Sequence, residues 1–323
     1  MPLLEVDNVT RRYPGHLAVD QVSFSVEQGQ LFALLGPSGC GKTTTLRLIA
    51  GFEQPDSGHI RLHGEAITHL PPYERRVNTV FQNYALFPHL TARANVEFGL
   101  RHERVRHVGN GPARDAAARV DAVLDLVQMT GKAASRPAQL SGGEKQRIAL
   151  ARSLVLEPDV LLLDEPLSAL DPNLRKQVRG ELKALQRRTG VTFLMVTHDQ
   201  EEALSMADCI GVMNAGRLEQ TGPPRGLYHR PRTRFVAGFL GAVNWIDGSG
   251  VRPEAVHVER DGTQGRDATI LAVTFLGNCV HVEAELAGGA RMVAEIQNPR
   301  SEFRPGDEVR LWWRGEDEMR PEA

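Results

Sequence analysis

A glycine-rich segment at residues 36–44, GPSGCGKTT, has the composition of a phosphate-binding loop. It matches the pattern G-x-x-x-x-G-K-[ST] and lies between an apolar run and a segment of helical period, as the pattern requires. Its glycines let backbone N–H groups converge on an anion, and a helix N-terminus adds positive potential. We expect Lys42 to reach the β- and γ-phosphates of a nucleotide and the Thr43 hydroxyl to ligate Mg²⁺. The other expected binding residues are Gly36, Pro37, Ser38, Gly39, Cys40, Gly41 and Thr44, with Cys40 interpreted as a small residue and not as a nucleophile.

Polar side chains follow three short apolar runs that read as strands. VLLLDEP (160–166) ends in Asp164 and Glu165, VNTVF is followed by Gln82, and FLMVT is followed by His198. The carboxyl ends of parallel strands gather at one edge of a sheet, where ligands bind. Alone, each residue would be an ordinary strand-end residue; beside a phosphate loop, a catalytic interpretation is favoured.

Each of these four side chains has a role that its chemistry suits. Asp164 is expected near Mg²⁺, and Glu165 is expected to polarise the water that attacks the γ-phosphate. Gln82 is expected to touch the metal or that water. His198 is expected to donate a hydrogen bond to the γ-phosphate.

The segment LSGGEKQR (140–147) begins a helix in an unusual way. Ser141 and Glu144 have the spacing of a capping box. Gly142 and Gly143 then fall in the first turn, where each glycine costs about 1 kcal/mol against alanine. Glycine does allow another molecule to approach the backbone closely, and a helix N-terminus offers free N–H groups to an anion. A simple capping box is the alternative.

The elements that would position these residues alternate between strand and helix. Strands are expected at 3–9, 18–26, 31–36, 77–81, 160–164 and 193–197, and helices at 43–52, 113–129 and 175–190. This alternation favours an α/β fold with a mostly parallel sheet. Residues 83–157 read as mostly helical, with a basic loop at 101–112 that is either solvated or a partner contact.

A change of texture after about residue 240 indicates a second domain. Short strands are expected at 268–275, 279–286, 291–296 and 308–313, separated by glycine-containing turns. We therefore expect a nucleotide-binding domain over residues 1–238, with its helical subdomain at about 83–157. A small all-β, barrel-like domain is expected over residues 239–323.

Composition narrows the class of protein. The 323 residues are 41% hydrophobic and 24% charged, which is typical of a soluble globular protein. The formal net charge is −2, which gives no support for a nucleic-acid partner. Three scattered cysteines suggest neither a disulfide framework nor a zinc site, and a reducing cytoplasm fits them. No signal peptide is expected at the N-terminus, and no apolar run approaches the roughly 20 residues that span a bilayer.

The motifs taken together, in this order along residues 3–240, resemble the ATPase subunit of an ABC transporter: GPSGCGKTT, Gln82, LSGGEKQR, VLLLDE, SALD (168–171) and TH (197–198). The resemblance implies ATP and Mg²⁺ as ligands and a head-to-tail homodimer. In such a dimer, Ser141, Gly142, Gly143 and Glu144 of one chain close on the ATP of the other, and Asp171 communicates across the interface. Tyr13, in RRYPG, matches the tyrosine that stacks on adenine in this family.

The same resemblance implies partners and a location. The C-terminal unit resembles the TOBE-type module of bacterial import ATPases, which places the chain on the cytoplasmic face of the inner membrane. A groove near Gln82 and residues 84–88 would receive a short helix of a transmembrane permease, with ordinary core packing as the alternative. A separate substrate-binding protein would act indirectly.

Other functions compete with this one. A soluble ABC protein of DNA repair or translation would fit one set of motifs, but no long coiled coil separates the phosphate loop from LSGGEKQR. A small-molecule P-loop kinase would leave LSGGEKQR and the second domain unexplained. Within the importers, residues 77–101 and 235–245 most resemble the spermidine/putrescine ATPases, with ferric iron, phosphonate or sugar import as alternatives.

Overall fold

The computed structural model describes residues 2–101, 114–260, 262–297 and 302–322 of the chain. The chain forms two compact units, residues 1–224 and residues 225–323. The sequence suggested a boundary at 238/239, whereas the two short helices α7 (Pro224–His229) and α8 (Arg234–Leu240) fall with the second unit. The basic loop expected at 101–112 lies, beyond Arg101, outside the described residues.

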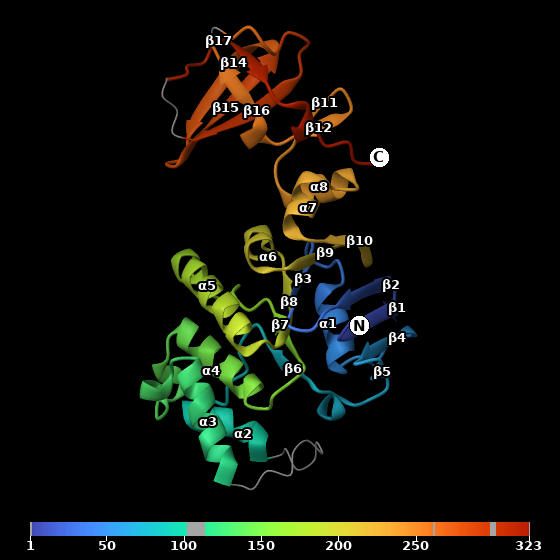
Figure 1. The fold of residues 1–323 in the computed structure, drawn as a ribbon, viewed down its shortest axis with the longest axis vertical. Coiled ribbons are helices and arrows are strands. Elements are labelled where there is room, and N and C mark those ends of the chain that lie inside the picture. Colours follow the sequence, from blue (N-terminus) through green and yellow to red (C-terminus); the bar gives the residue numbers. More distant parts are fainter. Residues whose placement is uncertain (1, 102–113, 261, 298–301, 323) are drawn as a thin grey trace. The chain divides into compact units, whose positions relative to one another are not determined.

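A six-stranded sheet forms the centre of the first unit, in the order β10-β9-β3-β8-β7-β6 (Figure 1). The strands are β3 (Leu31–Leu35), β6 (Val77–Val80), β7 (Val160–Asp164), β8 (Thr192–Thr197), β9 (Cys209–Asn214) and β10 (Arg217–Gly222). All neighbours pair in parallel except β10, which is antiparallel to β9. Every residue of β3 and β8 is buried, which explains their continuous apolar sequence. The predicted α/β class is confirmed.

A second, antiparallel sheet of the first unit has the order β2-β1-β4-β5. It comprises β1 (Leu4–Tyr13), β2 (His16–Val26), β4 (Ser57–Leu62) and β5 (Glu65–Ala66). Helix α1 (Lys42–Ala50) packs against β2 of this sheet and against β6, β7 and β8 of the six-stranded sheet. One apolar core therefore joins both sheets through α1, and Leu46, Leu48 and Ile49 of that helix are fully buried in it.

The helical part of the first unit lies in the expected segment. It contains α2 (Ala92–Arg101), α3 (Arg114–Leu126) and α4 (Gly142–Leu154), and α4 packs against both other helices and against β6. Two further helices follow β7 and β8, namely α5 (Pro172–Thr189) and α6 (Gln200–Met206). Figure 1 shows α2, α3 and α4 grouped together, with α5 beside α4.

The second unit is built around an antiparallel sheet with the order β13-β17-β14-β15-β16. Its strands are β13 (His257–Glu259), β14 (Arg266–Phe275), β15 (Cys279–Leu286), β16 (Arg291–Gln297) and β17 (Glu308–Trp312). A separate hairpin pairs β11 (Asn244–Ile246) with β12 (Ser249–Val251). Alternate residues of β15 and β16 point into an apolar core that includes Val282 and Met292, so this unit has a core of its own.

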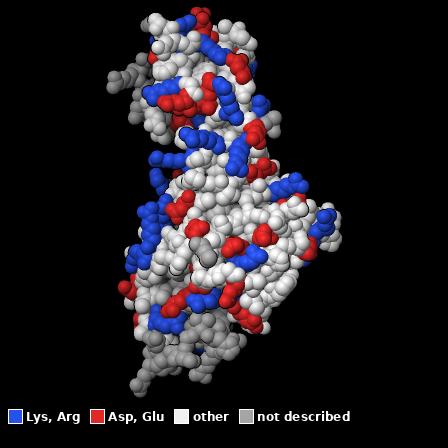
Figure 2. Space-filling model, turned by 45° about the vertical axis from the view of Figure 1, so that its right-hand side comes forward, with Lys and Arg blue, Asp and Glu red and all other residues white. Residues whose placement is uncertain are grey.

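The surface carries both signs of charge. Figure 2 shows Lys and Arg side chains interspersed with Asp and Glu on the visible face, in keeping with a formal net charge of −2. Among the helices of the described residues, none combines the length and the apolar character needed to cross a bilayer.

Candidate functional site

The glycine-rich loop connects β3 to α1, and its shape depends on two glycines. A Cβ on Gly36 would lie 2.3 Å from the Met213 carbonyl oxygen, and one on Gly41 would lie 2.2 Å from the Ala18 carbonyl oxygen. Gly41 also adopts a φ of +102° as the N-cap of α1, and no side chain caps this helix. The first N–H groups of α1 are therefore free to bind an anion at the loop.

Lys42 is held in readiness by the loop itself. Its side chain is buried, at 5% exposure for the residue, and Nζ donates to the carbonyl oxygens of Gly36 at 2.8 Å and Pro37 at 2.9 Å. A buried ammonium group needs such partners, and phosphate oxygens would be stronger ones. Cys40 is buried beside it, and burial raises the pKa of the thiol, which favours the neutral, unreactive form.

The loop meets the end of β7 at a possible cation site. The Thr43 hydroxyl donates to Asp164 Oδ1 at 3.3 Å. Burial raises the pKa of Asp164, and the neighbouring Glu165 charge adds to this effect. A hydroxyl and a partly desolvated carboxylate close to a phosphate loop are the oxygen ligands that Mg²⁺ prefers, so these residues fit the metal.

Glu165 lies at the centre of the other predicted catalytic residues. Its carboxylate is 3.1 Å from His198 Nδ1 and accepts a hydrogen bond from Gln82 Nε2 at 3.3 Å. The three residues follow β7, β8 and β6, which are neighbours in the sheet. The structure thus brings together the side chains that the strand-end argument grouped.

Two further features of this cluster were not visible in the sequence. Glu165 has a φ of +44°, and its N–H donates to the Val196 carbonyl oxygen at 3.0 Å. A left-handed non-glycine residue carries strain, which is common at functional sites. Ser168 Oγ accepts from Gln82 Nε2 at 3.1 Å and donates to the Glu165 carbonyl oxygen at 2.9 Å. Ser168 therefore links the backbone of Glu165 to the Gln82 side chain.

Arg152 is a second residue that the sequence did not reveal. From α4 it donates to the carbonyl oxygens of Ala85 at 2.6 Å and Tyr84 at 2.9 Å. Both acceptor residues have positive φ, at +45° and +62°. Arg152 thus holds the irregular segment after Gln82 against the helix that begins with the LSGGEKQR motif. Its position in α4 resembles that of any surface arginine, so the pattern carried no signal.

The LSGGEKQR motif forms the start of α4, where the capping box is complete. The Glu144 N–H donates to Ser141 Oγ at 3.3 Å, and the Ser141 N–H donates to Glu144 Oε2 at 2.8 Å. This second bond lowers the pKa of Glu144. A Cβ on Gly142 would lie 3.0 Å from a Leu170 methyl group, while one on Gly143 would make only ordinary contacts. Within this chain, packing restricts Gly142 and leaves room at Gly143.

The remaining predicted residues lie apart from the strand-end cluster. Asp171 caps α5, since its carboxylate accepts from the Leu174 N–H at 3.1 Å. Tyr13 is the last residue of β1, and the guanidinium of Arg11 lies 5.0 Å from the centre of its ring. The motif at the start of α4 belongs to the helical part of the unit, whereas α1 lies between the two sheets (Figure 1). A single chain therefore presents these residues as separate surfaces.

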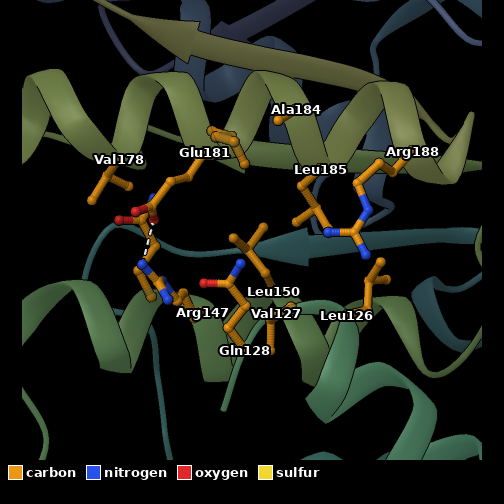
Figure 3. Close-up of a pocket in the computed structure, with 12 residues that line it drawn as sticks. Leu126, Val127, Gln128, Arg147, Leu150, Val178, Glu181, Ala184, Leu185 and Arg188 are labelled. Atoms are coloured by element: carbon orange, nitrogen blue, oxygen red, sulfur yellow. Dashed lines mark hydrogen bonds and ion pairs between the residues drawn. The ribbon is translucent and has the colours of Figure 1, made fainter.

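A cavity of about 130 Å³ lies just behind the LSGGEKQR motif, between α4 and α5 (Figure 3). Arg147 closes one side of it with an ion pair to Glu181 at 2.7 Å. Gln146 lines the cavity, is fully buried, and has no hydrogen-bond partner among the described residues for either amide atom. The motif helix is thus attached to α5 by an ion pair across an incompletely packed interface.

Comparison with known proteins agrees with this geometry. The family described as ABC transporter matches residues 19–168, and the TOBE domain matches residues 249–319. The spermidine/putrescine import ATP-binding protein PotA of Rubrobacter xylanophilus is 43% identical over 96% of this chain and 91% of its own length. An uncharacterized ABC transporter ATP-binding protein of Escherichia coli, YdcT, is 46% identical over 96% of this chain and 95% of its own length.

A solved structure is also similar. It is the dimeric structure of an ATP-binding cassette in a post-hydrolysis state, bound to ADP and phosphate. The similarity has a TM-score of 0.59 and 29% identity, and it covers 69% of this chain and 99% of the other.

Proposed function

The chain belongs to the family of ABC transporter ATP-binding subunits, and from this premise we propose that it hydrolyses ATP to drive polyamine import through a membrane permease. One observation carries the proposal of hydrolysis. The Glu165 carboxylate lies between His198 and Gln82 at the end of the strand that also carries Asp164, and Asp164 contacts the phosphate loop through Thr43.

The proposed reaction begins with phosphate binding to the loop. The free N–H groups at the start of α1 bind the phosphates, and Lys42 exchanges its two carbonyl partners for phosphate oxygens. Tyr13 stacks on the adenine ring. Thr43 and Asp164, with Gln82, would hold Mg²⁺, which supplies positive charge to the phosphates.

Hydrolysis requires a water molecule aligned with the γ-phosphorus. Glu165 accepts a hydrogen bond from that water and orients it for attack. His198 donates to the γ-phosphate from the other side of the carboxylate. Gln82 is shared with Ser168, so a shift of the segment after Gln82 would change the environment of Glu165 directly.

Two chains are proposed to complete each site as a head-to-tail homodimer. The N-terminus of α4 presents Ser141, Gly142 and Gly143 to the ATP bound by the partner. Gly143 has ordinary space around it in this chain, so a side chain there would fit until a second molecule approached. Asp171, at the start of α5, would lie at the same interface.

A permease is proposed to dock beside Gln82. Phe52 and Phe81 are 50% and 36% exposed, and their rings lie 5.8 Å apart. An exposed aromatic pair directly before Gln82 offers an apolar surface to a partner helix. Leu86 and Phe87, further along the same segment, are only half-buried. The chain would thus be a peripheral subunit on the cytoplasmic face of the inner membrane.

The cargo proposal depends on the relatives' names, because this chain is not expected to bind cargo itself. A polyamine cage requires aromatic rings and carboxylates around a multivalent cation. That role is assigned to a separate substrate-binding protein. Ferric iron, a phosphonate or a sugar remain alternative cargoes.

Reconstitution with its permease in liposomes tests the proposal. Polyamine-loaded binding protein should stimulate ATP turnover by the complex, whereas spermidine should not change the turnover of the isolated chain. Stimulation by another cargo with its binding protein, and not by spermidine, would contradict the polyamine assignment alone. Association with membranes that does not depend on co-expressed permease would favour the soluble ABC alternative.

A further inference from the structure

The second unit contains three metal-ligating side chains that ATP hydrolysis does not use. Cys279 and His281 lie on β15 and Glu295 lies on β16. One ligand atom from each residue lies within 4.8 Å of the others. His281 and Glu295 are directly opposite in the antiparallel register, and His281 Nε2 is 3.1 Å from Glu295 Oε2. Three donors of different chemistry therefore converge on one point.

The position of Cys279 in the strand is informative. The residues of β15 alternate, and Val280 and Val282 point into the apolar core of this unit. Cys279 and His281 therefore lie on the opposite face. Cys279 is nevertheless only 5% exposed, whereas the His281 and Glu295 side chains are 37% and 31% exposed. A shielded thiol with an accessible imidazole and carboxylate beside it suits metal binding.

An ordinary cross-strand ion pair would explain only part of this arrangement. Opposite residues such as His281 and Glu295 often pair across a sheet. That pairing leaves the thiol on the same face unexplained, since a core cysteine would point inward with Val280. The thiol is the ligand that turns a polar pair into a set of sulfur, nitrogen and oxygen donors.

We propose that Cys279, His281 and Glu295 bind one Zn²⁺ ion, with water as the fourth ligand. Mixed sulfur, nitrogen and oxygen ligands are typical of zinc, which is borderline-soft and tetrahedral. At zinc bond lengths, neighbouring ligand atoms lie about 3.3–3.6 Å apart, so side-chain rotations of about 1 Å suffice. On binding, the thiol releases its proton to solvent, His281 binds through unprotonated Nε2, and Glu295 binds as a carboxylate. The thiolate and carboxylate then balance the two positive charges of the ion.

Zinc bound here would cross-link β15 to β16 inside the second unit. The readout is therefore metal binding and the thermal stability of the full chain, both measured without nucleotide so that the phosphate loop holds no metal. Co²⁺ serves as the spectroscopic probe for Zn²⁺. We expect one Co²⁺ per chain, a thiolate-to-cobalt charge-transfer absorption, and displacement of Co²⁺ by Zn²⁺ with a rise in Tm.

Variants distinguish this site from chance binding. Cys279→Ser should abolish the charge-transfer absorption and weaken Zn²⁺ binding by more than the ~10–100-fold that loss of a supporting residue costs. Cys209→Ser, in the first unit, and Glu283→Gln, exposed on the same face of β15, are matched controls that should leave binding unchanged. Absence of stoichiometric binding by the full chain, or persistence of the absorption in Cys279→Ser, overturns the proposal. If Cys279→Ser does not fold, Glu295→Gln decides, because Zn²⁺ affinity unchanged within about 3-fold would equally overturn it.

Discussion

Replacing Glu165 by glutamine separates its catalytic role from its structural one. The carboxylate is 3.1 Å from His198 Nδ1 and 3.3 Å from Gln82 Nε2, and its side chain is 23% exposed. A glutamine has the same shape, so its amide oxygen can still accept from Gln82 while its NH₂ group faces a neutral imidazole. We therefore expect the free energy of unfolding to change by less than about 1 kcal/mol.

The effect on hydrolysis should be far larger. An amide cannot accept the proton of the attacking water, and loss of a general base typically costs ~10²–10⁴ in rate. This corresponds to about 2.7–5.5 kcal/mol in the activation free energy. ATP affinity should remain near that of wild type, because the phosphate contacts come from the loop and α1. The slow variant should then accumulate as an ATP-bound dimer.

The assay is steady-state ATP turnover together with nucleotide binding and light scattering in the presence of ATP and Mg²⁺. Glu27→Gln, an exposed carboxylate in the turn before β3, is the matched control and should retain full turnover. Turnover of Glu165→Gln within 10-fold of wild type would refute the assignment of the base. Loss of ATP binding by a folded variant would instead show that Glu165 supports the phosphate site.

Four further predictions follow from the same contacts. Arg152→Lys should lose the two-pronged grip on the segment after Gln82, lowering the free energy of unfolding by about 1–3 kcal/mol in denaturant titrations. Mixing Ser141→Arg chains with Lys42→Ala chains should restore ATP turnover that neither shows alone, because one composite site per mixed dimer stays intact; no recovery would count against action in trans. A chain ending at residue 224 should bind ATP with unchanged affinity by calorimetry, since the first unit has its own core. Burial raises the pKa of Glu202, so its favourable contribution is complete below about pH 4 and is lost as pH rises. Glu202→Gln should therefore stabilise the chain near pH 7 and make no difference at pH 4, as measured by unfolding at both values.

The strand-end residues could be predicted because their positions depend on local sequence and on one general rule. Glu165, Gln82 and His198 each follow a short apolar run, and parallel strands align their carboxyl ends. The phosphate loop was equally visible, since its glycine spacing reflects backbone contacts within a few residues. The α/β class followed from the alternation of periods, and the structure confirms it.

The contacts that remained hidden depend on tertiary placement. Arg152 reaches a segment 67 residues away in the chain, and no pattern in α4 marks it. The strained φ of Glu165 results from a hydrogen bond to the neighbouring strand β8. The cluster of Cys279 with Glu295 required the register of β15 and β16, which strand periodicity alone leaves open. Three scattered cysteines gave no hint of a zinc site because two of its ligands are not cysteines.

The glycine at position 143 connects stability to function. The capping box of Ser141 and Glu144 already satisfies the start of α4, so the helix gains nothing there from glycine. A Cβ on Gly143 would lie no closer than 3.6 Å to Leu174 or Val178, so alanine would fit and would stabilise the helix by about 1 kcal/mol. The chain therefore accepts a cost that its own packing does not require. A second surface that approaches this backbone accounts for the cost, and the composite ATP site of the proposed dimer is such a surface.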